Sequence, residues 1–417
     1  MASVIVVRGG RPLSGRVRIS GAKNAVLPAI VASLLTDEPL ILKRVPRLLD
    51  VETQLALIEA LGKRVEREGD VITIRGEAGV ATAPREIVSR MRASFLCLGP
   101  LLARLGEAHV PLPGGCVIGA RPVDLHLAGL ARLGADIRVD EGVVHAAGAL
   151  HGGEVWLRYP SVGATEQLLL AGATIPEEVE IVNPAREPEV MDLVRLLVAM
   201  GAEVKALEDR FIVRGGRLGE AEHAVIPDRI EAGTYLLAGT ITGGEAELAD
   251  VHPEHLTALL AKLEECGAEV EVSGDRVRAA APRGWRGIEV ETAPYPGFPT
   301  DLQPQLTAFL SLARGRSIIW ERVFESRFGH VGELIRMGAR ITLQGQAIAV
   351  EGVEELRGTE VAATDIRAGA ALVLAGVAAR GVTRIRGVEH LRRGYENMEE
   401  KLARLGAKVW VEEASVT

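Results

Sequence analysis

The chain has 417 residues, of which 47% are hydrophobic, 25% charged and 3% aromatic. This length suits two domains, and the scarcity of aromatic residues leaves Val, Leu, Ile and Ala to build their cores. The net charge of −8 argues against general nucleic-acid binding, and the lack of any run of about 18 apolar residues argues against a membrane span.

The first predicted element is a strand from Val4 to Ile19. This segment lacks the basic and then apolar pattern of a signal peptide, so we expect a cytoplasmic protein. The strand precedes the first of the six repeat units that begin at residue 20. Because the last unit lacks a full hairpin, we expect the strand to complete the sheet of the C-terminal half.

From residue 20 onward one unit recurs six times: an amphipathic helix that ends at a Gly, followed by a β-rich stretch. A Gly just after a helix adopts the left-handed conformation that closes its C-terminus, which explains its constant place. After five of these glycines, alternating apolar residues around a polar turn predict a hairpin. The glycines are Gly62, Gly134, Gly201, Gly267, Gly338 and Gly406.

A second helix in the front half of each unit is apolar nearly all round, so it should be buried, with the Gly-capped helices outside. Each unit is therefore roughly βαβαββ, with strands around a helical centre. We predict an α/β protein of two domains with three repeats each, residues 20–227 and residues 1–19 with 228–417. The buried helices are expected within 20–35, 89–106, 161–175, 228–241, 300–313 and 364–378.

The residues at the helix starts differ sharply among the six copies, although a shared fold needs no such variety. Helix N-termini offer free N–H groups and a positive dipole end to phosphate and carboxylate, and Arg adds bidentate recognition. We therefore predict an anion-binding cleft between two facing domains. The residues concerned are Lys23, Asn24, Asp50, Thr53, Arg92, Arg121, Asp124, His126, Ser161, Val162, Gly163, Arg186, Glu187, Arg229, Glu231, His255, Thr300, Asp301, Arg327, Asp365, Arg367, Arg392 and Arg393.

Structural roles stay open for the same residues. Ser, Thr and Asp at a helix start also fit plain N-caps, as at Ser161, Thr300, Asp301 and Asp365. A single Arg near a helix start is often a solvated surface group, and the histidines fit hydrogen-bonded structural positions. No His, Cys and carboxylate group has zinc spacing, so neither a metal site nor a cofactor is expected.

The three cysteines differ in their surroundings. Cys97 lies in an apolar run, and Cys266 takes the place that Leu or Met occupies in the other repeats, so both are expected in the core. Cys116 lies in the glycine-rich segment LPGGCVIGARP, five residues before Arg121. Such an exposed, cationic loop favours the reactive thiolate. The residues alone leave open whether Cys116 is functional.

At LPGGCVIGARPVDLH the pattern becomes specific, and the sequence resembles the UDP-N-acetylglucosamine enolpyruvyl transferases. Further motifs stand in the family's order over almost the whole chain: SGAKNAVLP, MRAS, SVGAT, NPAREPE, PDRIEAGT, FPTDLQ, VFESRFGH, ATDIRA and RRGYE. The resemblance implies a two-domain inside-out α/β barrel with the active site between the domains. It also implies that the sugar 3-hydroxyl attacks C2 of phosphoenolpyruvate, and that phosphate leaves through a tetrahedral intermediate in the first committed step of peptidoglycan synthesis.

The resemblance assigns roles to residues that match the family's motifs. Cys116 is implied to be the general acid, to act in product release and to be the residue alkylated by fosfomycin. Asp301 is implied to be the base for the sugar hydroxyl, and Asp365 to lie near the reacting centre. Phosphoenolpyruvate is implied to bind the cationic residues Lys23, Arg92, Arg121 and Arg393.

For the nucleotide sugar, the resemblance implies contacts at Asn24 and Val323 near the sugar, with Arg327 at the same site. One departure is Tyr159, where many relatives carry a Lys that helps to hold the diphosphate; Arg158 or the Tyr159 hydroxyl would have to replace it. The uridine and diphosphate contacts are implied to be Arg121, Pro122, Val123, Asp124, Leu125, Ser161, Val162 and Gly163.

Three other functions fit the sequence less well. A shikimate 3-phosphate enolpyruvyl transferase shares the fold but lacks the loop that carries Cys116. A silent paralogue that only binds the nucleotide sugar is disfavoured by the intact Cys116, Asp301 and Arg393, and a repeat scaffold should vary over one broad face. Beyond phosphoenolpyruvate and UDP-N-acetylglucosamine, no nucleic-acid or membrane partner is expected. The chain is expected to be a monomer.

Overall fold

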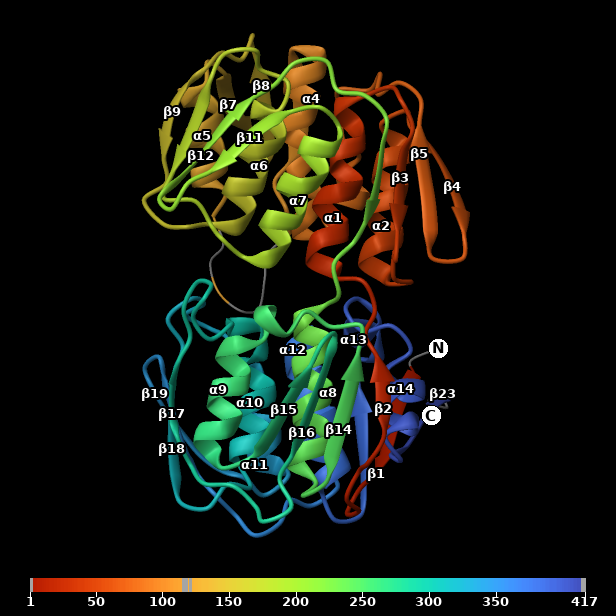
Figure 1. The fold of residues 1–417 in the computed structure, drawn as a ribbon, viewed down its shortest axis with the longest axis vertical. Helices are drawn as coiled ribbons and strands as arrows, with labels where there is room; N and C mark the ends of the chain where they lie inside the picture. The colour runs from red at the N-terminus through yellow and green to blue at the C-terminus, as the bar shows by residue number, and fades with distance from the viewer. Residues whose placement is uncertain (1–2, 115–118, 120–121, 414–417) are drawn as a thin grey trace. The chain divides into compact units, whose positions relative to one another are not determined.

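The computed structural model describes residues 3–114, 119 and 122–413. They divide into two compact units (Figure 1). The first domain contains residues 21–114 and 122–226, and the second contains residues 3–20 and 227–413. Each domain has its own buried hydrophobic core.

Three small sheets surround the helices of the first domain, in the strand orders β13-β3-β5-β4, β6-β8-β7 and β11-β12-β10-β9. Its strands are β3 (Leu40–Lys43), β4 (Arg64–Glu68), β5 (Val71–Arg75), β6 (Glu107–Pro111), β7 (Asp136–Asp140), β8 (Val143–Ala147), β9 (Gly153–Trp156), β10 (Val179–Val182), β11 (Glu203–Ala206), β12 (Arg210–Arg214) and β13 (Ala221–Ala224). Its helices are α1 (Lys23–Ala32), η1 (Ser33–Leu35), α2 (Leu49–Ala60), α3 (Arg85–Val88), η2 (Arg92–Cys97), α4 (Leu98–Leu105), α5 (Asp124–Arg132), α6 (Val162–Gly172) and α7 (Pro188–Ala199).

The second domain repeats this plan with the strand orders β21-β22-β1-β23, β15-β16-β14-β2 and β17-β18-β20-β19. Its strands are β1 (Ser3–Arg8), β2 (Arg16–Arg18), β14 (Glu245–Ala249), β15 (Glu269–Ser273), β16 (Arg276–Ala280), β17 (Glu289–Glu291), β18 (Arg316–Trp320), β19 (Arg340–Gln344), β20 (Ala347–Glu351), β21 (Glu360–Ala362), β22 (Val382–Arg386) and β23 (Lys408–Glu413). Its helices are α8 (Arg229–Ile241), η3 (Pro253–His255), α9 (Thr257–Cys266), η4 (Thr300–Leu302), α10 (Gln303–Leu310), α11 (Gly329–Arg336), α12 (Ile366–Ala378), α13 (Val388–Arg392) and α14 (Met398–Arg404).

The repeat predicted from the sequence is confirmed. The six glycines that follow the outer helices all have φ between 89° and 111°, in the left-handed region that Gly enters at no steric cost. The five predicted hairpins form antiparallel pairs. Helices α1, α6, α8, α10 and α12 are buried along almost their whole length, so the α/β fold with a helical centre in each domain is confirmed.

Two predicted elements were wrong in detail. The single strand expected from Val4 to Ile19 is two strands, of which β1 lies between β22 and β23 and β2 pairs with β14. The helix expected over 89–106 is divided into η2 and α4. Pro100 has no N–H to donate to the carbonyl of Leu96, and that carbonyl instead accepts a hydrogen bond from Gln167 at 3.3 Å.

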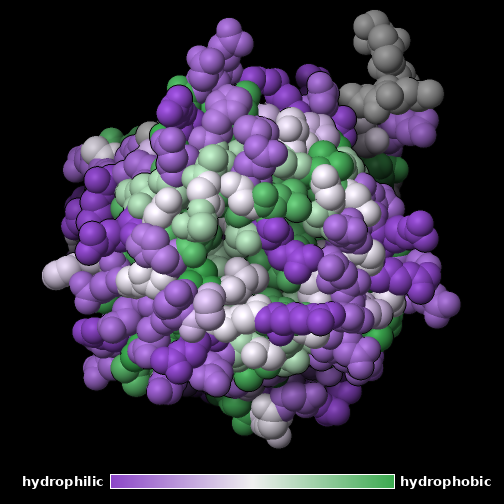
Figure 2. Space-filling view, turned by 90° about the horizontal axis from the view of Figure 1, so that it is seen from above, coloured by the Kyte–Doolittle hydropathy of each residue, from purple (hydrophilic) through white to green (hydrophobic). Residues whose placement is uncertain are grey.

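The predicted core cysteines are confirmed: Cys97 and Cys266 are buried, and burial raises the pKa of each thiol to about 12. Hydrophilic residues cover most of the face in Figure 2, with hydrophobic residues between them. None of the described helices combines the length and the apolar character that a membrane crossing needs.

Candidate functional site

The first domain places Lys23 at the first position of the buried helix α1. Its side chain is only 8% exposed, and its ammonium lies 3.2 Å from the carboxylate of Asp50, which is also buried. A buried ammonium at a helix start is suited to anions, because the N–H groups and dipole of the helix add to its charge. Asn24, the next residue, is half-buried.

Arg92 and the start of α5 meet in the same domain. The Arg92 guanidinium donates to the carbonyl oxygen of Pro122 at 3.0 Å. Asp124 begins α5 and forms an ion pair with Arg158, so the side chain that was expected to replace a missing lysine is engaged with this carboxylate. Tyr159 is 40% exposed. The neighbours of Asp124 differ in burial, since Val123 is buried and Leu125 half-buried.

The segment Ser161–Gly163 begins helix α6. Ser161 is its N-cap, and its hydroxyl accepts a hydrogen bond from the backbone N–H of Ala164 at 3.4 Å. The predicted structural role of Ser161 as an N-cap is therefore confirmed. Val162 and Gly163, the first two residues of α6, are half-buried. A Cβ at Gly163 would lie 2.9 Å from the His126 ring, which explains why this position carries no side chain.

The second domain holds Asp301 in a clamp of two arginines. Arg327 donates to Oδ1 of Asp301 at 2.6 Å, and Arg367 donates to Oδ2 at 2.7 Å. Both arginines are at most 6% exposed, whereas the Asp301 side chain is about a quarter exposed. Asp301 and Thr300 make no N-cap hydrogen bond, so the alternative of a plain helix cap is wrong for these two residues.

The electrostatic state of Asp301 follows from this clamp. Burial alone would raise the pKa of the carboxyl group, but the charges of Arg367 and Arg327 outweigh burial and hold the pKa well below its usual range. Asp301 is therefore a firmly ionised carboxylate and, while both arginines hold it, a weak proton acceptor.

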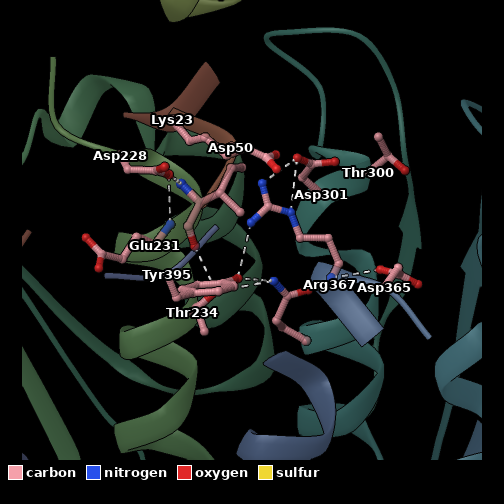
Figure 3. Close-up of polar contacts among 12 residues, drawn as sticks. Lys23, Asp50, Asp228, Glu231, Thr234, Thr300, Asp301, Asp365, Arg367 and Tyr395 are labelled. Atoms are coloured by element: carbon pink, nitrogen blue, oxygen red, sulfur yellow. Dashed lines mark hydrogen bonds and ion pairs between the residues drawn. The ribbon is translucent and has the colours of Figure 1, made fainter. Parts of the chain in front are cut away.

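Behind the clamp lies a buried polar network that the sequence did not predict. Arg367 reaches the Tyr395 hydroxyl at 3.3 Å, and the same hydroxyl contacts Thr234 at 3.0 Å and Gln305 at 3.1 Å. Figure 3 shows Arg367 extending between Asp301 and Tyr395. Thr234 and Gln305 come from two buried helices, which also bury other polar residues such as Glu231 in α8 and Gln303 in α10. The available signal in the sequence was a polar side chain on a helix that was predicted to be buried.

The buried carboxylate of Glu321 fixes the segment that contains Val323. Its Oε2 accepts from the hydroxyl of Thr300 at 2.9 Å, and its Oε1 accepts from the backbone N–H groups of Val323 at 2.9 Å and Phe324 at 3.0 Å. Glu321 is fully buried. The Val323 segment is therefore tied to the residue that precedes Asp301.

Asp365 and Arg393 occupy helix termini in the second domain. Asp365 is the N-cap of α12, accepting from the N–H groups of Arg367 at 2.8 Å and Ala368 at 3.0 Å. This cap orients the first turn from which Arg367 reaches Asp301. Arg393 is half-buried at the end of α13. The predicted residues Cys116 and Arg121 lie outside the described residues.

Sequence reasoning also missed His330, which is 1% exposed in α11. Burial lowers its pKa to about 3 despite the opposing charge of Asp365. The imidazole is thus neutral at physiological pH. The motif VFESRFGH contains this residue, but nothing in the local pattern indicates its burial.

Several known proteins resemble this chain in sequence over nearly its whole length. The profile of the family described as EPSP synthase (3-phosphoshikimate 1-carboxyvinyltransferase) matches residues 7–402. UDP-N-acetylglucosamine 1-carboxyvinyltransferase 1 of Caldanaerobacter subterraneus subsp. tengcongensis is 47% identical over 98% of this chain and 100% of its own length. The UDP-N-acetylglucosamine 1-carboxyvinyltransferase of Gloeobacter violaceus is 49% identical over 97% of this chain and 89% of its own length.

Solved structures show the same fold. The enolpyruvyl transferase NikO from Streptomyces tendae has a TM-score of 0.89 at 27% identity, covering 99% of this chain and 100% of that one. The EPSP synthase from Acinetobacter baumannii has a TM-score of 0.76 at 19% identity, with the same coverage. Because the sequence identity is only 19%, the similarity to the EPSP synthase shows a shared fold and nothing about function.

Proposed function

The chain belongs to the EPSP synthase family of carboxyvinyl (enolpyruvyl) transferases, and we propose that it transfers the enolpyruvyl group of phosphoenolpyruvate to the 3-hydroxyl of UDP-N-acetylglucosamine. The observation that carries this choice of acceptor is the 47–49% identity, over 97–98% of the chain, to relatives named for that reaction. The product would enter peptidoglycan synthesis. The proposed location is the cytoplasm, and the proposed state is a monomer.

The reaction has two balanced steps. In the addition, C3 of phosphoenolpyruvate gains a proton, while the sugar oxygen forms a bond to C2 and loses its proton. In the elimination, C3 gives up a proton and the bond from C2 to the phosphate oxygen breaks, so the carbon–oxygen bond to the sugar survives. The chemistry needs an acid at C3, a base at the hydroxyl and cations around the phosphate.

We assign the base to Asp301 and the acid to Cys116. Asp301 is supported by its partial exposure and by the rigid contacts that aim its carboxylate. Its low pKa, however, is unsuitable for a base, because an efficient base has a pKa near the operating pH. Asp301 must therefore lose part of its positive surroundings before it accepts a proton.

Arg327 is the partner that we expect to leave. Besides Asp301, it contacts the Thr300 hydroxyl and lies 4.7 Å above the Phe324 ring, whereas Arg367 is anchored by Tyr395 from behind. A bound phosphate offers Arg327 a bidentate anion in exchange for Asp301. Substrate binding would then raise the pKa of Asp301 in the complex that needs it as a base.

The proposed substrate contacts come from both domains. The charge of Lys23 is already neutralised by its ion pair with Asp50. A substrate carboxylate or phosphate therefore competes with Asp50 for the Lys23 ammonium. We assign phosphoenolpyruvate to Lys23, Arg92, Arg121 and Arg393, with Asp365 nearby. We assign the nucleotide sugar to Asn24, Pro122, Val123, Asp124, Leu125, Ser161, Val162, Gly163, Val323 and Arg327, with Arg121 shared.

The acceptor distinguishes the proposed reaction from enolpyruvyl transfer to shikimate 3-phosphate. The test measures phosphate release from phosphoenolpyruvate with each acceptor in turn, at equal concentrations. We expect release with UDP-N-acetylglucosamine and none above background with shikimate 3-phosphate. The reverse result would assign the chain to the other reaction, and tight nucleotide-sugar binding without release would make it a binding protein.

A further inference from the structure

Three metal-ligating side chains lie together after strand β14. His252, Glu254 and His255 occupy four consecutive positions with Pro253, at the start of the short helix η3. The two imidazole rings are stacked with centroids 4.9 Å apart, and Nδ1 of His252 lies 3.3 Å from a carboxylate oxygen of Glu254. One donor atom from each of the three residues lies within 4.8 Å of the other two.

We propose that His252, Glu254 and His255 bind one divalent transition-metal ion, such as Zn²⁺ or Co²⁺, on the surface of the second domain. Two imidazole nitrogens and one carboxylate oxygen suit these ions, whereas Ca²⁺ and Mg²⁺ prefer oxygen ligands alone. Because Glu254 is exposed and both histidines are half-exposed, water completes the coordination sphere. Small side-chain rotations bring the donors to bonding distance.

The backbone holds these donors in place before an ion arrives. The N–H of His255 donates to the carbonyl of His252 at 2.9 Å, which closes the turn between the two ligands. Pro253 restricts the backbone inside that turn. Val251 and Leu256, on either side of the segment, are both 3% exposed and anchor it in the core. Because the backbone is already ordered, binding of the ion costs little backbone conformational entropy, which favours affinity.

The donor set of the cluster suits a transition-metal cation. Glu254 supplies the carboxylate oxygen, and the two histidines supply the ring nitrogens. The turn explains why sequence analysis expected no metal: the spacing His-x-Glu-His matches no zinc motif, and only the η3 turn brings the donors together.

The proposed ion would lie beside the segment that leads to Asp301. The Tyr295 hydroxyl donates to the carbonyl of Glu254 at 3.4 Å. His255 also lines a surface hollow with Arg229, Tyr295 and Leu302, and Leu302 follows Asp301 in η4. An ion on His255 would stiffen one wall of this hollow. The inference does not depend on the proposed reaction.

The test is a titration of chelator-treated, full-length protein with Co²⁺, followed by visible absorption and by metal analysis after gel filtration. We expect saturation at one ion per chain and competition by Zn²⁺. Removing one ligand should weaken binding at least about tenfold in His255→Ala and in Glu254→Gln. The matched control is His109→Ala, since His109 and His145 form the other close histidine pair, with Nδ1 atoms 2.9 Å apart on β6 and β8. That variant should bind as tightly as the wild type.

Two results would overturn the site. One is unchanged affinity in the His252→Ala/His255→Ala double variant, and the other is no saturable binding by the wild-type protein. Circular dichroism and the thermal unfolding midpoint without metal show whether each variant is folded. Glu254→Gln keeps the shape of the side chain, so it separates loss of a ligand from loss of the fold. Neither readout uses catalysis, so failure of the site leaves the proposed function untouched.

Discussion

The guanidinium of Arg367 joins Asp301 to Tyr395: one end lies 2.7 Å from the Asp301 carboxylate and the other 3.3 Å from the Tyr395 hydroxyl (Figure 3). Arg367 is 4% exposed and Tyr395 is 1% exposed. The orientation of the proposed base is thus set by buried groups that the solvent hardly reaches.

Replacing Asp301 by Asn should remove the base while keeping the shape of the side chain. We expect kcat to fall by about 10²–10⁴-fold, measured as phosphate release at saturating substrates. The matched control is Glu291→Gln, since Glu291 forms an exposed ion pair with Arg322 outside the clamp. Full turnover by Asp301→Asn would remove Asp301 from the role of base.

The two arginines of the clamp should differ in their effects. Loss of either cation raises the pKa of Asp301 in the free enzyme, so the acidic limb of kcat/KM should move to higher pH in Arg327→Met and in Arg367→Met. Only Arg327→Met should also raise the KM for UDP-N-acetylglucosamine at neutral pH, because Arg327 is the arginine proposed to bind that substrate. Equal KM changes in both variants would contradict the exchange of Arg327 between Asp301 and substrate.

Two buried tyrosines provide a test of the network behind the clamp. Tyr395→Phe deprives Arg367, Thr234 and Gln305 of a shared partner, so we expect the free energy of unfolding to fall by about 1–3 kcal/mol. In the part of the chain that the structure describes, the Tyr235 hydroxyl is buried without a hydrogen-bond partner. Tyr235→Phe should therefore be neutral or stabilising in urea unfolding. The opposite ranking would contradict the network.

Glu231 should make stability depend on pH. It is 2% exposed, bonds Lys401 and accepts from the N–H of Ser20 at 2.8 Å, yet burial outweighs the lysine and raises its pKa to about 7. Because the folded chain holds this proton more tightly than the unfolded chain, the stability that the proton provides is complete below about pH 4 and is lost as pH rises through about 7.

Wild-type protein should therefore lose stability between pH 5 and pH 7 relative to Glu231→Gln, by about 2 kcal/mol. Urea unfolding of both proteins at these two pH values measures the difference. The Glu245→Gln variant is a suitable control, because hydrogen bonds from Arg278 and Ser14 lower the pKa of Glu245 instead of raising it. A constant difference between wild type and Glu231→Gln would contradict the raised pKa.

Local features of the fold followed from the sequence, and long-range contacts did not. The positive φ at Gly62 and at the five equivalent glycines was predictable, because each Gly directly follows a helix whose apolar periodicity is visible in the preceding residues. Asp301 and Arg367 are 66 residues apart, and no local pattern pairs a carboxylate with one of 41 arginines. The repeat did mark both residues as helix starts. Tyr395 and Glu321 were missed because their roles arise only from contacts between segments.

Addition followed by elimination can be tested by running the reaction in D₂O and analysing the product by mass spectrometry. Addition places a solvent deuteron on C3, and elimination removes one of the three hydrogens of that methyl group. We expect the enolpyruvyl ether of UDP-N-acetylglucosamine with deuterium on its vinyl carbon, and one phosphate released per product. A product of the correct mass without deuterium would contradict addition and elimination, and the absence of that product would contradict the proposed function.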